Sequence, residues 1–157
     1  MTQKSFTQQI AEITKAEKVE IVLQAAGHSR YDVFITINGQ RTNLATFHLL
    51  AFPGCCGACI SFACSVSTLW RNKGLGQLLN KMRIQAAYNA GYTLLVCTDK
   101  TANTHQVKLL TANGWVKSAE FRNKRTNNMV GLFTVMVKDT GIPIGEGACP
   151  LNYAGQP

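Results

Sequence analysis

Charged residues are scarce in this chain of 157 residues, and acidic residues are scarcer still. Only 15% of the residues are charged, whereas 46% are hydrophobic. This balance excludes a disordered or coiled-coil protein and fits one well-packed globular domain. Eight Asp and Glu stand against sixteen Lys and Arg, so the formal net charge is +8. A chain this basic predicts a ligand or partner that carries negative charge.

The basic excess lies in the middle and later part of the chain. Between Arg71 and Arg125 there are ten Lys and Arg but only two acids, Asp99 and Glu120. The remaining residues carry equal numbers of basic and acidic side chains. An anionic ligand is therefore expected in the region that starts near Arg71.

Two further absences concern the cellular compartment. Residues 1–12 lack the apolar core of a secretory signal, which favours reduced thiols for the six cysteines and predicts a cytoplasmic protein. Residues 42–70 contain no formally charged side chain, but Pro53, Gly54 and Gly57 interrupt them. The stretch thus falls short of the roughly 20 apolar residues of a membrane-spanning helix, and no membrane partner is expected.

The first half of the chain predicts a short helix followed by a meander of strands. Phe6, Ile10 and Ile13 have helical spacing, which predicts a helix over residues 6–15. Runs rich in β-branched residues end at turn signals, Gly27 and Asn38-Gly39. The predicted strands cover residues 19–24, 32–37, 43–52 and 58–66.

After residue 71 the apolar spacing changes to that of a helix. Leu75, Leu78, Leu79, Met82 and Ala86 form one apolar stripe, and Gly91 follows as a stop signal. A strand over 92–98, a helix over 103–112 and a strand over 129–138 are expected next. The order predicts an α+β fold with a mixed sheet, as one domain over residues 1–139, and a loop or arm over 140–157.

The connection between the strand that ends near Val66 and the following helix has the composition of a phosphate-binding turn. A parallel crossover places the helix N-terminus beside the carboxyl end of that strand, where open sheets bind ligands. Gly74 and Gly76 remove side chains that would keep a phosphate from the backbone N–H groups. Arg71 and Lys73 add positive charge. The turn is predicted to bind a pyrophosphate.

Two common phosphate-binding motifs do not fit this spacing. A dinucleotide fingerprint needs a small residue at position 79 and an acid about 20 residues further on, but position 79 is Leu and the next acid is Asp99. A Walker loop ends in Gly-Lys-Ser/Thr, whereas Gly76 is followed by Gln77 and Leu78. The alternative interpretation is an ordinary glycine-rich helix start with solvated basic residues.

The segment Arg71–Gly76, Arg-Asn-Lys-Gly-Leu-Gly, resembles the Arg/Gln-x-x-Gly-x-Gly/Ala motif of the GCN5-related N-acetyltransferase (GNAT) family. A second segment, Asn103-x-x-Gln106-x-x-Leu109-Leu110-x-x-Asn113-Gly114-Trp115, resembles the Asn-x-x-Ala-x-x-Leu-Tyr-x-x-x-Gly-Phe helix of the same family. The resemblance covers residues 58–115, extends through the strand at 129–138 and is weak before residue 43. It implies a GNAT-like fold, a central mixed, mostly antiparallel sheet flanked by helices.

The resemblance also implies a site for acetyl-CoA as cosubstrate, without a metal. Backbone groups of Cys64, Ser65 and Val66 would contact the acetyl and pantetheine portion, and Asn103 would contact the pantetheine arm. The coenzyme pyrophosphate would be held by Arg71, Asn72, Lys73, Gly74, Leu75, Gly76 and Gln77.

The usual catalytic side chains of that family are missing. The Tyr that protonates the leaving thiolate in many members is replaced by Leu110, and the Glu base of the branch that modifies peptide N-termini is replaced by Thr98. Backbone N–H groups near Val66 can still stabilise the tetrahedral oxyanion. The sequence does not single out a catalytic side chain among the candidates Asp99, His48, His105, Tyr92 and Cys97.

The cysteines allow further interpretations. Cys56 and Cys59 have the C-x-x-C spacing of a redox pair or half a zinc site, but a redox pair needs a helix start and a zinc site needs two more ligands at motif spacing. Buried reduced thiols are therefore expected. Cys64 falls beside the predicted thioester, where a thiol could accept the acetyl group; a packed strand residue is the favoured interpretation.

Two functions stay open. One is an N-acetyltransferase that transfers the acetyl group directly from acetyl-CoA to a primary amine of a small molecule, peptide or protein. The other is a catalytically weak CoA-binding or basic nucleic-acid-binding module on the same fold. A solvated hairpin turn is favoured over nucleic-acid binding for the basic cluster Lys117, Arg122, Lys124 and Arg125, because no nucleic-acid motif accompanies it. The acceptor and the oligomeric state, a homodimer included, stay open.

Overall fold

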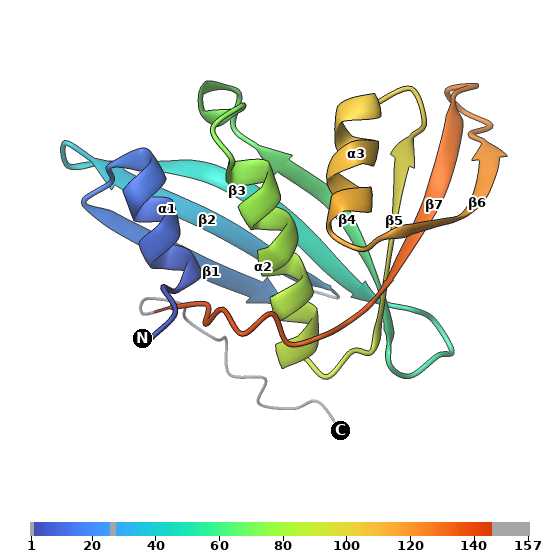
Figure 1. Cartoon of the computed structure of the whole chain (residues 1–157), viewed down its shortest axis with the longest axis horizontal. Helices are drawn as coiled ribbons and strands as arrows, with labels where there is room; N and C mark the ends of the chain where they lie inside the picture. Colours follow the sequence, from blue (N-terminus) through green and yellow to red (C-terminus); the bar gives the residue numbers. More distant parts are fainter. Residues whose placement is uncertain (1, 26–27, 146–157) are drawn as a thin grey trace.

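A mixed sheet with helices packed on it forms the fold (Figure 1). The computed structural model describes residues 2–25 and 28–145, and within them the sheet has seven strands in the order β1-β2-β3-β4-β5-β7-β6. Every neighbouring pair is antiparallel except β4 and β5, which are parallel. The predicted α+β class with a mixed, mostly antiparallel sheet is confirmed. The elements are α1 (Phe6–Thr14), β1 (Lys18–Ala25), β2 (Ser29–Ile37), β3 (Gln40–Ala51), β4 (Ala58–Val66), the 3-10 helix η1 (Thr68–Trp70), α2 (Leu75–Asn89), β5 (Leu94–Lys100), α3 (Thr104–Ala112), β6 (Val116–Arg122) and β7 (Met129–Met136).

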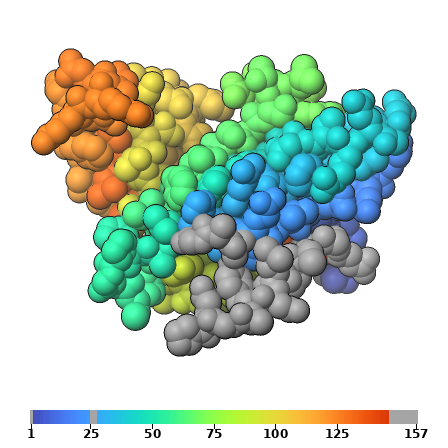
Figure 2. Space-filling model, turned by 180° about the vertical axis from the view of Figure 1, so that it is seen from behind, coloured from blue at the N-terminus to red at the C-terminus, as the bar shows by residue number. Residues whose placement is uncertain are grey.

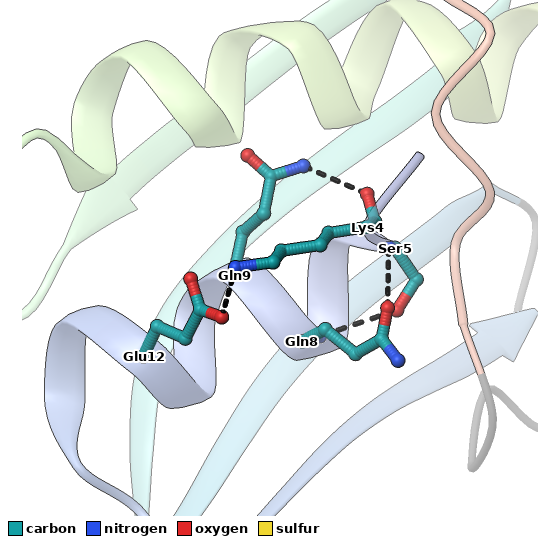
Figure 3. Close-up of polar contacts among 5 residues, drawn as sticks. All are labelled: Lys4, Ser5, Gln8, Gln9 and Glu12. Carbon is teal, nitrogen blue, oxygen red and sulfur yellow. Dashed lines mark hydrogen bonds and ion pairs between the residues drawn. The ribbon is translucent and has the colours of Figure 1, made fainter. Parts of the chain in front are cut away.

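Helix α1 begins at Phe6 because Ser5 caps it. The Ser5 hydroxyl oxygen accepts a hydrogen bond from the Gln8 N–H at 3.2 Å, and the Ser5 N–H donates to Oε1 of Gln8 at 2.8 Å (Figure 3). This reciprocal pair satisfies two N–H groups that the helix itself cannot. Lys4, which precedes the helix, also forms an ion pair with Glu12 in the helix. Phe6 is thereby fixed in the core, where it is fully buried.

The hairpin between β2 and β3 turns at the predicted Asn38-Gly39 pair. Both residues have positive φ angles, 52° and 74°. That combination is typical of the two-residue hairpin turn whose twist matches the flanking strands. The other predicted turn signal, Gly27, lies outside the described residues.

The core forms where α1 and α2 pack side by side on one face of the sheet (Figure 1). All five members of the predicted apolar stripe of α2 are buried there. Each of the Leu and Met side chains among them stabilises the fold by about 1.5–3 kcal/mol through its burial. From the sheet, Val33, Ile35, Phe47, Leu49 and Leu95 belong to the same core. Ile35, Phe47 and Leu49 alternate with more exposed neighbours along their strands.

Strand β6 was not predicted, and the interpretation of the basic cluster as a hairpin turn was wrong for Lys117 and Arg122, which lie in this strand. Val116–Arg122 pairs with β7 as the edge strand of the sheet, and the turn follows it. All seven residues of β6 are exposed. An edge strand without a buried face has no need for alternating apolar residues, so its pattern resembles that of a loop.

Residues 140–145 contain neither helix nor strand and run back to the start of α1. The Phe6 N–H donates to the Pro143 carbonyl oxygen at 2.9 Å, and the Thr140 N–H donates to Oε1 of Gln85 at 2.8 Å. Ile142 is buried in the core. The boundary after residue 139 stays a prediction, and residues 146–157 lie outside the described residues. No helix within the described residues is long and apolar enough to cross a membrane.

Candidate functional site

The parallel strands β4 and β5 pair only at one end and then separate. Their paired positions are Ala58 with Leu94, Cys59 with Leu95 and Ile60 with Val96. Beyond them β4 follows β3, with a register shift in that pairing, and Ala63 has a positive φ of 50°. Figure 1 shows the two strands diverging from their paired ends. In the view from behind, the yellow and orange segment with α3 and β5–β7 stands on one side and the cyan strands on the other (Figure 2).

The divergence leaves a cleft of about 860 Å³ between the two strands. Its lining comes from β4, from the turn before α2 and residues 76–83 of that helix, from β5 and from α3. The closed end lies where Ser61 and Cys97 follow the last paired residues of the two strands. The open end lies at Gly74 and Gly76, where α2 begins.

The start of α2 presents free backbone donors at the open end. Gly74 is its N-cap, with a φ of 83°, and supplies no side-chain cap. The N–H groups of the first helical turn therefore have no acceptor within the helix. Arg71 donates from Nε to the carbonyl oxygen of Val66 at 3.1 Å, which holds its positive charge beside this turn. Such a helix start attracts anions, phosphates above all.

Most of the residues predicted to hold the coenzyme line this cleft. Lys73 and Leu75 do not: Leu75 is 4% exposed and packs in the core, and the Lys73 ammonium lies 5.7 Å from the centre of the Trp70 ring. None of the basic side chains in the predicted turn cluster lines the cleft either. The predicted residues that line the cleft are Cys64, Ser65, Val66, Arg71, Asn72, Gly74, Gly76, Gln77 and Asn103.

Asn103 begins α3 and at the same time contacts β5. Its Oδ1 accepts from the Gln106 N–H at 3.4 Å as the N-cap of the helix, and its Nδ2 donates to Oδ1 of Asp99 at 3.5 Å. This explains why an Asn stands at the start of the helix without reference to any ligand. The same contacts hold Asn103 and Asp99 at the cleft wall.

The candidate catalytic side chains are divided between the cleft and other places. Asp99, His105 and Cys97 line the cleft. Burial raises the pKa of Asp99, although hydrogen bonds from Lys100 and Asn103 oppose the shift. His48 instead lies against another histidine, with Nδ1 2.8 Å from Nε2 of His28, and Tyr92 does not line the cleft.

The two positions of the missing catalytic residues have different surroundings. Leu110 is completely buried in the core, so no side chain at the position of the usual acid faces the cleft. Thr98 lines the cleft and is exposed, but it is neither an acid nor a base. The absence of both usual side chains is thus a feature of the folded site as well as of the sequence.

Sequence analysis missed a buried polar cluster in the cleft floor. Arg83 is 2% exposed and lies on α2, where it donates from Nε and Nη2 to Oδ1 of Asn80 at 2.9 and 2.7 Å and from Nη1 to the Ser61 hydroxyl at 3.3 Å. All three residues line the cleft. The sequence did contain a sign that Arg83 is buried, because it falls four residues after Leu79 and three before Ala86, within the apolar stripe of the helix.

The five cysteines within the described residues are free thiols with contrasting surroundings. The expectation of a buried thiol is confirmed for Cys59 and wrong for Cys56, which is exposed like Cys55. Burial raises the pKa of the Cys59 thiol to about 12. Burial also raises the pKa of Cys97 to about 11 and that of Cys64 in the same direction. In the described part of the chain no group of three or more His, Cys, Asp or Glu side chains is placed to hold a metal ion.

No protein-family model matches the sequence, and no curated protein matches it. Solved structures do match the fold. An acetyltransferase of the GNAT family from Streptococcus pneumoniae superposes with a TM-score of 0.59 at 20% identity, over 73% of this chain and 70% of the other. A Bacillus subtilis acetyltransferase in complex with CoA gives 0.62 at 13% identity, over 77% of this chain and 100% of the other. The ribosomal-protein-S18-alanine N-acetyltransferase from Escherichia coli gives 0.59 at 15% identity, over 80% and 77%.

At these identities the likeness concerns the backbone alone. The sheet has one parallel pair, that pair separates, and the helix that follows β4 begins at the mouth of the resulting cleft. The architecture expected from the two sequence motifs is confirmed by the superpositions. The chain therefore has the GNAT fold.

Proposed function

We propose that this chain is an N-acetyltransferase that transfers the acetyl group directly from acetyl-CoA to a primary amine of a small molecule, peptide or protein. The observation that carries the proposal is the cleft between β4 and β5, with the start of α2 at its open end. A ligand with phosphates at one end and an extended polar arm at the other matches this arrangement. The CoA complex of the Bacillus subtilis protein with the same fold supports the choice.

The residues at the open end fit a pyrophosphate. The N–H groups of residues 75–77 at the helix start donate to phosphate oxygens, and Gly76 keeps the approach to the backbone open. Arg71 adds a charge that its hydrogen bond to Val66 already orients. A charge-assisted contact of this kind contributes about 1.5–3 kcal/mol to the binding of an anion.

The strand edge beyond Ile60 fits the pantetheine arm. From Ser61 to Val66 the side of β4 that faces β5 has no strand partner among the described residues. An extended arm with amide groups can bind there as an added strand would, through main-chain hydrogen bonds. The thioester at the end of the arm then lies beside the backbone N–H groups of β4, which can stabilise the oxyanion of the tetrahedral intermediate.

The chemistry does not require the usual acid. A neutral amine attacks the thioester carbonyl carbon, and the coenzyme leaves as a thiolate. Because a thiol such as Cys has a pKa of about 8.5, its conjugate base is a moderate leaving group without protonation. Direct transfer also agrees with the raised pKa of Cys64, since a thiol that stays protonated is a poor nucleophile.

The charge of the site narrows the class of acceptor. Asp99 is the one acid that lines the cleft in the described part of the chain, whereas Arg71, Arg83 and Lys108 also line it. Charge complementarity therefore disfavours polycationic acceptors and favours a neutral or anionic molecule that carries one amine.

Calorimetric titration with acetyl-CoA tests the proposal. Gly74→Glu places a carboxylate in the proposed phosphate site and should abolish the micromolar binding expected of the wild type. Gly91→Glu is a matched control, because Gly91 has the same left-handed φ, 87° against 83°, and a Cβ at either position meets no atom within 4 Å. Gly91 follows the opposite end of α2, so this variant should bind like the wild type.

Three outcomes are distinguishable. Loss of binding in Gly74→Glu alone supports the site and justifies an acceptor screen that detects free CoA thiol. Equal loss in both variants indicates backbone strain, and equal retention places the coenzyme elsewhere; either contradicts the proposed phosphate site. Absence of binding by the wild type overturns the acetyltransferase proposal and makes nucleic acid the next ligand to titrate against this basic chain.

A further inference from the structure

Arg83 is a buried cation whose side-chain hydrogen bonds all go to neutral groups. Its hydrogen bonds go to the amide oxygen of Asn80 and the hydroxyl of Ser61, and its guanidinium carbon lies 4.6 Å from the centre of the Trp115 ring. Asp99 in the same cleft interacts with Arg83 electrostatically, but within residues 2–25 and 28–145 neither it nor any other carboxylate lies close enough to form an ion pair with Arg83. A charge removed from water in this way is costly unless an anion accompanies it. Its position in the cleft floor suggests that the anion belongs to a ligand.

The distance along α2 places Arg83 away from the proposed phosphate site. Gly76 and Arg83 are seven residues apart on the helix, a separation of roughly 10 Å at 1.5 Å per residue. Arg83 contacts Ser61, which is the first residue of β4 beyond the last pair with β5. A coenzyme with its phosphates at the open end would therefore direct its thiol end toward Arg83.

Asn80 supplies a second, independent indication. The residue is 1% exposed, and its Nδ2 has no hydrogen-bond partner among the described residues. Both Nε and Nη2 of Arg83 donate to its Oδ1, which fixes the orientation of the amide. A buried N–H group without an acceptor is costly and rare in folded proteins. The cluster thus offers a cation and a free N–H donor, the complement of an anionic acceptor atom.

We propose that Arg83 and Asn80 form a binding site for the coenzyme sulfur and stabilise the thiolate that leaves during acetyl transfer. The inference rests on the proposed function. In the step itself, a bond forms between the amine nitrogen and the carbonyl carbon, and the carbon–sulfur bond breaks with its electron pair on sulfur. The amine proton passes to solvent water. The thiolate is held by Arg83 until water protonates it, so that a buried cation takes the place of the Tyr that Leu110 replaces.

Two thiols of the protein itself, Cys64 and Cys97, lie in the cleft near Arg83 and Asp99. Burial raises the pKa of Cys64 and Cys97, Arg83 lowers it for both, and Asp99 raises it for both. A coenzyme thiol between these side chains is subject to the same two charges. The charged and titratable groups that line the cleft are Arg71 before α2, Arg83 on α2, Cys64 on β4, Cys97 and Asp99 on β5, and His105 and Lys108 on α3.

The test compares CoA with desulfo-CoA, which lacks the sulfur atom. Calorimetry between pH 7 and pH 10 gives the ratio of the Kd of desulfo-CoA to the Kd of CoA. Groups other than the thiol titrate in the same way with either ligand, so their effects on the two Kd values cancel in the ratio. The ratio rises with pH when the bound thiol has a lower pKa than the free thiol, and falls when the bound pKa is higher. Removal of the Arg83 charge should lower the ratio at pH 10 by at least about tenfold, equivalent to one pKa unit.

Two variants remove that charge by independent routes. Arg83→Met replaces the cation with an apolar side chain of similar length, a change that buried sites often tolerate. Asn80→Asp keeps the shape of the side chain and neutralises Arg83 in place, because the carboxylate oxygen falls where Oδ1 already accepts two hydrogen bonds. Either folded variant is sufficient, and both should lower the ratio.

Two controls keep the charge of the cluster. Arg83→Lys retains a cation and should keep the ratio within about threefold of the wild type. Lys81→Met removes the same charge from the same helix, but Lys81 does not line the cleft, and it should leave the ratio unchanged. A ratio in Arg83→Met and Asn80→Asp equal to that of the wild type, with CoA bound by all three, overturns the inference and leaves the proposed function standing. If the wild type binds neither ligand, the proposed function itself fails.

Discussion

Arg71 donates a hydrogen bond from Nε to the carbonyl oxygen of Val66, 3.1 Å away. The contact joins the turn before α2 to the last residue of β4, so the cation keeps a fixed place at the mouth of the cleft. Lys73 is only two residues further along but lies against the Trp70 ring and outside the cleft. The two cations are therefore equal in charge and different in position.

This difference predicts unequal effects on coenzyme binding. Arg71→Met should weaken the binding of CoA by at least about tenfold, because an oriented, charge-assisted contact with phosphate is lost. Lys73→Met should weaken it by less than about threefold, since only a screened long-range attraction is removed. Calorimetry at two salt concentrations measures both. Equal effects of the two substitutions would mean that net charge, and not the anchored geometry, governs binding.

A second prediction concerns a buried acid outside the cleft. Asp32 on β2 is 1% exposed and accepts hydrogen bonds from Asn43 and Thr46 on β3, and its other oxygen lies 2.9 Å from Nε of Arg30. Asp32→Ala leaves these donors without their acceptor and should lower the free energy of unfolding by about 2–4 kcal/mol. Urea denaturation followed by circular dichroism gives the value.

The matched control is an acid whose ion pair is exposed. Glu12 pairs with Lys4 on the surface of α1, where both side chains are more than half exposed. Glu12→Ala should change the free energy of unfolding by no more than about 1 kcal/mol, since exposed pairs contribute little. If both substitutions lower the free energy of unfolding by the same amount, burial of the Asp32 carboxylate has no special role in stability.

The fold could be predicted because its core elements have strong periodic patterns. The α2 stripe and the β2–β3 turn at Asn38-Gly39 follow from side-chain spacing and from backbone preferences of single residues. β6 could not be found this way, because an exposed edge strand places no constraint on which side chains alternate. The bend of β4 at Ala63 could not be found either, since an alanine with positive φ is imposed by the surrounding structure and has no sequence signature.

The site shows the same contrast between local and long-range information. Gly74 and Gly76 at the start of α2 indicate a phosphate-binding turn by composition alone, which is a local property. The exclusion of Lys73 and Leu75 from the cleft depends on which way each side chain points after folding. The charged Arg83 within an apolar stripe was visible in the sequence, but its meaning required knowing that α2 forms the floor of the cleft.

A third prediction concerns His48, which lies on β3 next to His28. Burial lowers the pKa of His48, and the neighbouring His28 and Arg30 lower it further, against an opposing effect of Asp32. The unfolded chain keeps a His pKa of about 6.5, so His48 binds a proton more readily in the unfolded chain than in the native state. The free energy of unfolding should therefore fall as the pH decreases from 7 through 6.5 toward the lowered pKa of the folded state.

The substitution His48→Gln should reduce this loss. Urea denaturation at pH 7 and pH 5.5 measures the change for the wild type and the variant, and the wild type should lose more stability between the two values. His105→Gln, which removes an exposed histidine on α3, is the control for simply having one His fewer. An identical loss in His48→Gln and the wild type would contradict a lowered pKa of His48 in the folded state.

A fourth prediction follows from the thiols and bears on direct acetyl transfer. Cys55 and Cys56 are exposed, whereas burial raises the pKa of Cys59 to about 12, that of Cys97 to about 11, and that of Cys64 in the same direction. Because the thiolate is the reactive form, iodoacetamide at pH 8 should label the exposed pair at least about a hundredfold faster than the other three. Peptide mass spectrometry gives the rate at each site, and labelling in urea should remove the difference.

The raised pKa of Cys64 should also prevent a stable acetyl–Cys64 thioester when the wild type is mixed with acetyl-CoA in the absence of an amine. Rapid labelling of Cys64 together with such an adduct would establish a covalent route and contradict direct transfer, whereas slow labelling and no adduct leave the amine as the first acceptor of the acetyl group.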